Sequence, residues 1–269
     1  MRVLHDLIGP DRDVRPRHDP VPPARPYLVA STPRSGSGLL CRGLAAAPGA
    51  GSPLEYFNPI QRGLLAERWG SDGALAGYLR DLYAHRTTPA GVFGAKLHWD
   101  QLVALRAEAL GLPAAEPEYP LDGGWLDRLF PEARFVRTIR LDLDRQAVSL
   151  WFALHTDTWS LAADEAPDDR EDVPYDLDGI EGCRRSIESA EVHWDRFLRH
   201  NGIEPVIVVY EELVAAYDAT LEHVLREVAP EALGSPLPSA PTTRRLSDDH
   251  SERMVERLLA DRARLGALP

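Results

Sequence analysis

Cysteines and long apolar stretches are scarce in this chain of 269 residues. The two cysteines, Cys41 and Cys183, are far apart in the sequence, which excludes a disulfide scaffold and favours a reducing compartment. No apolar run approaches the roughly 18 residues of a membrane helix. Charges also interrupt the N-terminal segment where a signal peptide needs an apolar core. We therefore expect a cytoplasmic protein.

Positive charge is also in short supply. Lysine and arginine number 30 against 42 acidic residues, which gives a formal net charge of −12. General nucleic-acid binding needs a basic face, and attachment to anionic membranes needs a basic patch. Neither nucleic acid nor membrane is expected as a partner. The hydrophobic share of 44% is ordinary for a globular protein and allows a substantial core.

The distribution of prolines and apolar residues suggests a short leader and one domain. Residues 1–26 are rich in proline and charge, which predicts a poorly ordered leader or a clasp on a neighbouring subunit, while 27–269 form a single domain. Short apolar runs predict buried strands, with Val206 to Tyr210 the clearest because β-branched residues dominate it. The expected strands are 27–30, 92–97, 134–139 and 206–210, and the expected helices are 39–47, 60–85, 99–110, 142–162, 179–200, 211–228 and 251–264. This alternation predicts the α/β class, a parallel sheet flanked by helices on both faces.

Between Asp164 and Asp178 lie eight acidic residues and one base, Arg170. Such a run usually forms a solvated loop, and a regulatory lid is the alternative.

The sequence directly after the first strand, STPRSGSGLL at 31–40, predicts an anion-binding loop. Small residues let backbone amides approach an anion, and the following helix N-terminus adds partial positive charge. A plain turn would not need an arginine and three hydroxyls. A Walker A loop would need a lysine that is absent, a dinucleotide-binding loop would need glycine at Cys41, and a phosphatase loop would need a cysteine before the glycines. The predicted ligand-binding residues of this loop are Thr32, Pro33, Arg34, Ser35, Gly36, Ser37, Gly38 and Leu39.

This loop resembles the 5′-phosphosulfate loop of sulfotransferases that use 3′-phosphoadenosine 5′-phosphosulfate (PAPS). The wider match resembles the bacterial trehalose 2-sulfotransferase type and continues through GSPLEYF at 51–57, GAKLHWDQ at 94–101 and RLDLDRQAVSLW at 140–151. The resemblance implies a P-loop-like sulfotransferase fold, a homodimer, PAPS as donor with adenosine 3′,5′-bisphosphate as product, and no metal.

A second part of the nucleotide site is expected where the third strand ends. Arg140 closes that strand and would point into the crevice where α/β folds bind ligands, and Ser149 follows on the next helix. Guanidinium fits phosphate in a bidentate manner. The resemblance assigns the 3′-phosphate to Arg140 and Ser149, and it suggests a contribution from Arg245 near the C-terminus.

Sulfuryl transfer needs a base for the acceptor hydroxyl and a cation for the leaving oxygen. The resemblance favours Glu55 as base, which would need a pKa raised by burial, and His98 is the rival. Arg34 would stabilise the leaving group, and Lys96 would orient acceptor or sulfuryl oxygens. The aromatic residues that would line an acceptor pocket, or else form core, are Tyr56, Phe57, Trp99, Trp151, Phe152 and Trp159.

The sequence departs from the family pattern at Gly38, at Ser52 and at Leu141. Gly38 removes a hydroxyl that is common there, and Ser52 replaces a glutamate on the acceptor side, so the acceptor is left open between carbohydrates and other small hydroxyl compounds. Two other functions are alternatives: a nucleotide- or anion-binding regulator, and a kinase-like phosphotransferase that would need Mg²⁺.

Overall fold

The computed structural model describes residues 8–14, 22–113, 121–159, 172–234, 237 and 248–266. Its centre is a parallel four-stranded sheet in the order β2-β1-β3-β4, so the first strand of the chain lies inside the sheet. The strands are β1 (Arg25–Ser31), β2 (Val92–His98), β3 (Arg134–Ile139) and β4 (Val206–Val209). The predicted α/β class and its parallel sheet are thus confirmed.

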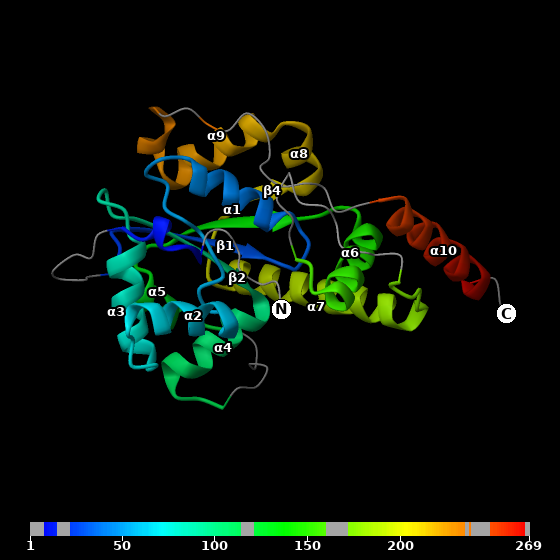
Figure 1. Ribbon diagram of the computed structural model, residues 1–269, viewed down its shortest axis with the longest axis horizontal. Coiled ribbons are helices and arrows are strands. Elements are labelled where there is room, and N and C mark those ends of the chain that lie inside the picture. Colours follow the sequence, from blue (N-terminus) through cyan, green and yellow to red (C-terminus); the bar gives the residue numbers. More distant parts are fainter. Residues whose placement is uncertain are drawn as a thin grey trace.

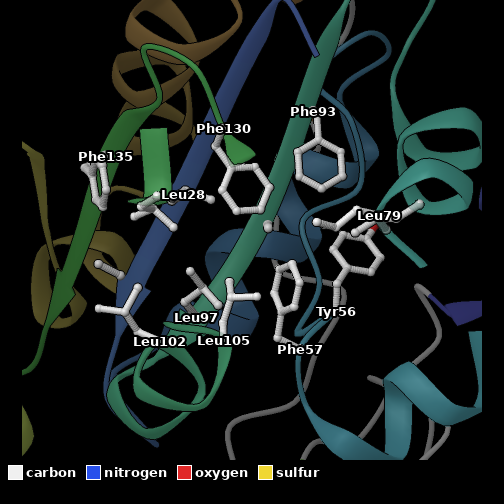
Figure 2. Packing of buried hydrophobic residues seen from close by; sticks show 14 of the residues in the cluster. Leu28, Tyr56, Phe57, Leu79, Phe93, Leu97, Leu102, Leu105, Phe130 and Phe135 are labelled. Atoms are coloured by element: carbon white, nitrogen blue, oxygen red, sulfur yellow. The ribbon is translucent and has the colours of Figure 1, made fainter. Parts of the chain in front are cut away.

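Alternate residues of β1 feed two different cores, as the two-residue period of a strand requires. Leu28 and Ala30 face a large cluster that includes Phe93 and Phe130, whose rings stack at 5.9 Å between centroids. Figure 2 shows these rings packed beside the leucines of β1 and β2. The helices that contribute to this cluster are α2 (Pro59–Trp69), α3 (Leu75–Arg86), α4 (Trp99–Leu110), α5 (Gly124–Leu129) and α7 (Leu177–His200).

The opposite face of the sheet has its own core. Tyr27 and Val29 pack there against leucines of α1 (Ser37–Ala46) and α9 (Tyr217–Val228). Figure 1 shows α1, α8 and α9 on one side of the sheet and α2 to α5 on the other. The remaining elements on this face are α8 (Tyr210–Ala215) and the 3-10 turn η3 (Pro230–Gly234).

A third apolar cluster lies away from the sheet, where α6 (Leu143–Thr156) and α10 (Asp249–Gly266) pack with α7. In Figure 1 α10 projects at the far end of the molecule from α3. Since α6 follows β3 directly, this cluster holds the helix that starts beside the predicted nucleotide site.

Several helix boundaries differ from the sequence expectation. The single helix expected over 60–85 is two, because Gly70 ends α2 in the left-handed conformation with φ of 68°. Helix α6 ends six residues early, where Asp157 has φ of 51°. The helix expected over 211–228 is broken at Ala216, and the short α5 was not expected at all.

Of the predicted leader, the structure describes residues 8–14, which pack against the domain, and residues 22–26, of which Arg25 and Pro26 belong to β1. Ile8 is buried in the large core, and its carbonyl accepts from Arg86 Nη2 at 3.3 Å. Asp13 accepts from Trp69 Nε1 at 3.0 Å and lies 3.1 Å from Arg86 Nε. The 3-10 turn η2 (Pro10–Arg12) lies in this segment. Residues 1–7 and 15–21 lie outside the described residues, and for them the leader stays a prediction.

Candidate active site

The loop that joins β1 to α1 contains two residues in the left-handed backbone region. Arg34 has φ of 64° and Gly36 has φ of 85°. A Cβ at Gly36 would lie 2.5 Å from Cδ2 of Tyr210, so both the backbone and the space demand glycine. Because Gly36 is the N-cap residue, no side chain caps the first turn of α1, and that turn contains no acid. The first amides of α1 therefore form an N-terminus suited to an anion.

Two of the loop hydroxyls hold the loop itself. Thr32 Oγ1 donates to Glu191 Oε1 at 2.7 Å and accepts from Gln146 Nε2 at 3.0 Å. Ser35 Oγ donates to the Thr32 carbonyl at 2.8 Å. Ser37 Oγ, in contrast, has no hydrogen-bond partner within the described part of the chain. The hydrogen bonds of Thr32 and Ser35 therefore hold the loop in place, and the Ser37 hydroxyl is left to donate to a ligand.

A buried ion pair under the loop was not anticipated from the sequence. Arg137 is 1% exposed on β3 and binds the Glu191 carboxylate of α7. Burial raises the pKa of the Glu191 carboxyl despite the Arg137 guanidinium beside it. The sequence does place an arginine inside an apolar strand, and a buried arginine needs a carboxylate partner. The sequence does not indicate which acidic residue provides that carboxylate.

The residues predicted to hold the nucleotide phosphates lie next to the loop. Arg34 Nε donates to Ser149 Oγ at 2.9 Å, and Arg140 Nη1 donates to the Arg34 carbonyl at 3.4 Å. The Arg140 guanidinium lies 4.5 Å from the centre of the Tyr210 ring. The end of β1, the end of β3 and the second turn of α6 thus meet at one point. Arg245 lies outside the described residues.

Glu55 lies in a second cluster on the neighbouring strand. Its segment runs beside β2, where the Lys96 amide donates to the Leu54 carbonyl at 2.9 Å. Lys96 Nζ lies 2.6 Å from Glu55 Oε1, and His98 Nε2 lies 3.6 Å from the same oxygen. Gln101 Nε2 of α4 donates to Glu55 Oε2 at 2.7 Å. All three residues predicted here from the sequence are brought together, and Gln101 is an addition.

The expected pKa of Glu55 is wrong in direction. Burial by itself raises this pKa, but the Lys96 ammonium and the His98 ring beside the carboxylate outweigh it. The pKa of Glu55 therefore lies well below its ordinary value. The carboxylate is ionised near neutral pH, and its charge is balanced before any ligand arrives.

The two clusters meet at Ser31 and His98, which pair in register across β1 and β2. His98 Nδ1 lies 3.0 Å from Ser31 Oγ and 3.2 Å from the Ser31 carbonyl. With Nδ1 directed at Ser31, the other ring nitrogen, Nε2, faces Glu55. Since Thr32 follows Ser31, the Glu55 cluster is adjacent to the start of the anion-binding loop.

Most of the candidate acceptor aromatics are core residues. Tyr56, Phe57, Trp99 and Phe152 are all buried. Trp159 is 40% exposed, and its carbonyl accepts from Arg34 Nη1 at 2.5 Å. Trp151 is half-buried. Among these six aromatics, only Trp151 and Trp159 have surface to offer a ligand.

A parallel sheet whose first strand leads through a glycine-capped loop into a helix, with arginines beside that loop, is the architecture of P-loop-like sulfotransferases. The family model described as Stf0 sulphotransferase matches residues 26–261. The chain belongs to this family and is a sulfotransferase.

Two relatives named trehalose 2-sulfotransferase match nearly the whole chain. The Mycobacterium tuberculosis protein is 30% identical over 265 residues, which covers 90% of this chain and 97% of the relative. The Mycolicibacterium smegmatis protein is 29% identical, with coverage of 89% and 96%. A solved sulfotransferase from Alicyclobacillus acidocaldarius aligns at 17% identity with a TM-score of 0.44, covering 91% of this chain and 95% of that chain. Within the described residues, no helix combines the length and the apolar character needed to cross a membrane.

Proposed function

We propose that this sulfotransferase moves a sulfuryl group from PAPS to a hydroxyl of a small carbohydrate. The observation that carries the proposal is the meeting of the open N-terminus of α1 with Arg34, Arg140 and Ser149, directly beside the Glu55 cluster. An anion-binding half and a proton-accepting half therefore lie at the same edge of the sheet.

The residues at the loop fit the anionic groups of PAPS. Gly36 leaves the first amides of α1 open, and Ser37 offers a hydroxyl without another partner among the described residues. Arg140 and Ser149 would take the 3′-phosphate, for which guanidinium and hydroxyl donors are well suited. When bound, PAPS supplies an activated sulfuryl group on a phosphate leaving group.

In the proposed mechanism Glu55 accepts the proton of the acceptor hydroxyl at a carboxylate oxygen. Lys96 Nζ, 2.6 Å from Glu55 Oε1, keeps Glu55 ionised and therefore able to accept a proton. The same contact makes the carboxylate a weaker base. The guanidinium of Arg34 neutralises negative charge that develops at the anion-binding loop. His98 lies 3.6 Å from the same Glu55 oxygen and can share the proton once Glu55 has taken it.

The carbohydrate class of acceptor rests on the names of the relatives and on one structural feature. Both relatives are named for trehalose. Trp159 is 40% exposed and its backbone carbonyl accepts from Arg34, so an aromatic side chain with free surface is attached close to the loop. Ser52, where the family pattern has an acid, argues for a sugar other than trehalose. A homodimer and a cytoplasmic location stay predictions.

The proposal is tested by calorimetric titration of adenosine 3′,5′-bisphosphate without added metal, with AMP and ATP as controls. We expect micromolar binding of the bisphosphate only, weakened about a hundredfold in Arg140→Ala through loss of a charge-assisted contact. Arg226→Ala is the matched control, because it removes an exposed arginine of α9 that pairs with Glu222 outside the proposed site. Preference for ATP with Mg²⁺ would replace this proposal by a phosphotransferase. Tight bisphosphate binding without sulfation of any sugar in a panel headed by trehalose would favour a regulator.

A further inference from the structure

We propose that Gln101 is the positioning residue that holds the Glu55 carboxylate in its working orientation. This inference rests on the proposed role of Glu55 as base. Gln101 lies at the start of α4, is 5% exposed, and donates from Nε2 to Glu55 Oε2 at 2.7 Å. That contact fixes one carboxylate oxygen, while Lys96 binds the other.

The orientation of the Gln101 amide is dictated by the helix it begins. Its Oε1 accepts from the backbone amide of His98 at 3.3 Å, the reach of a third helical residue back to the N-cap. Because Oε1 is used in this way, Nε2 must point away from the backbone and toward Glu55. The same side chain therefore caps α4 and aims a donor at the base.

Gln101 differs from the other groups around Glu55 because it carries no charge. The charged or titratable groups that face Glu55 are Lys96 and His98 of β2 and the thiol of Cys41 on α1. Burial raises the pKa of Cys41 to about 12, so that thiol is neutral. The Lys96 ammonium keeps Glu55 ionised, and Gln101 orients the carboxylate without adding further charge. A carboxylate held by both oxygens loses rotational freedom, which is how a base is pre-organised.

Gln101→Glu separates capping from positioning. Glutamate is a normal residue for the capping role, so helix α4 keeps its cap. The introduced carboxylate, however, is an acceptor that faces the Glu55 carboxylate and repels it. We expect turnover about tenfold below wild type near pH 8. At about pH 6 we expect a smaller deficit than at pH 8, because protonation of either carboxylate removes the repulsion between them.

The controls use the same helix and the same site. Asp100→Asn removes a charge from the exposed neighbour of Gln101, and it should leave turnover within about twofold of wild type at both pH values. The KM for PAPS should be unchanged in Gln101→Glu, since the Gln101 side chain forms its hydrogen bonds with Glu55 and the His98 amide. A variant equal to wild type at both pH values would mean that Gln101 only caps α4, which overturns the proposal. If Glu55→Gln itself remains active, the proposed base is wrong and the role of Gln101 falls with it.

A second measurement needs no turnover. The ¹³C signal of the Glu55 carboxyl, followed by NMR against pH, should titrate at a higher pH in Gln101→Glu than in wild type. In Asp100→Asn it should titrate where it does in wild type. Equal titration in Gln101→Glu and wild type would show that residue 101 does not contact Glu55 in solution and would overturn the proposal.

Discussion

The two halves of the site differ in how their charge is balanced before a ligand binds. On the donor side, defined by residues 32–37 with Arg140 and Ser149, Gly36 leaves the first turn of α1 without a capping side chain, and that turn holds no acid. On the acceptor side, defined by Glu55, Lys96, His98 and Gln101, the carboxylate already has its cation at 2.6 Å. The donor side is thus arranged to receive charge with its ligand, whereas the acceptor side is balanced in advance. A sulfuryl donor is highly anionic and a sugar is neutral, which matches this division.

The largest effect is expected for a substitution that disables the acceptor side and leaves the donor side intact. Glu55→Gln removes the proposed proton acceptor and should lower turnover by about 10² to 10⁴. The affinity for adenosine 3′,5′-bisphosphate should stay within about twofold, because no loop contact is lost. Steady-state rates and calorimetry on the same preparation measure the two. Activity within about threefold of wild type would exclude Glu55 as the base.

The next largest effect is expected for a substitution that disturbs the donor side and leaves the acceptor side intact. Gly36→Ala forces an alanine into a φ of 85° and sets its Cβ 2.5 Å from the Tyr210 ring. We expect a loss of roughly 1–3 kcal/mol in unfolding free energy and about tenfold weaker bisphosphate binding. Denaturant titration and calorimetry provide the measurements. Gly63→Ala on α2, outside the loop and with open space around it, should leave the bisphosphate affinity unchanged, and equal weakening by both substitutions would refute the argument.

The smallest expected effect is on the pH dependence of stability, and it tests whether the acceptor side is charge-balanced without a ligand. The pKa of folded Glu55 lies below that of an unfolded glutamate, near 4.3, so its ionised form stabilises the fold. That stabilisation is fully present above about pH 4.3 and is lost as the pH falls through the lower folded pKa. Glu55→Gln should therefore cost on the order of 2 kcal/mol at neutral pH and progressively less below about pH 4. A cost that does not vary with pH would contradict the sign of this shift.

Local signals in the sequence were sufficient for the strands and the loop. Val206 to Val209 is a β-branched run, and the glycines, hydroxyls and arginine at 32–38 follow a strand directly. Both features depend on neighbours in the chain. The broken helices depended on single residues such as Gly70 and Asp157, whose left-handed conformation is easily missed in a periodic pattern.

The parts of the site that could not be predicted depend on distant segments. Glu191 and Gln101 gain their roles only when α7 and α4 pack beside β1 and β2. The pKa of Glu55 was predicted from burial alone, but its direction is decided by competition between burial and the Lys96 and His98 side chains that the fold places beside it. Sequence reasoning can name the groups in such a competition, and only their distances decide which of them prevails.

The position of β1 has a consequence for how the protein is made. Among the strands that the structure describes, this one is the first to leave the ribosome, yet it lies inside the sheet, where Tyr27 pairs with Gly94 on one side and with Arg134 on the other. Its first strand partner, β2, follows later in synthesis, and its second partner, β3, follows only after more than a hundred further residues. Pairings so remote in sequence are slow to form and leave a nascent chain prone to aggregate. We expect heterologous production to gain from slower synthesis or from added chaperones.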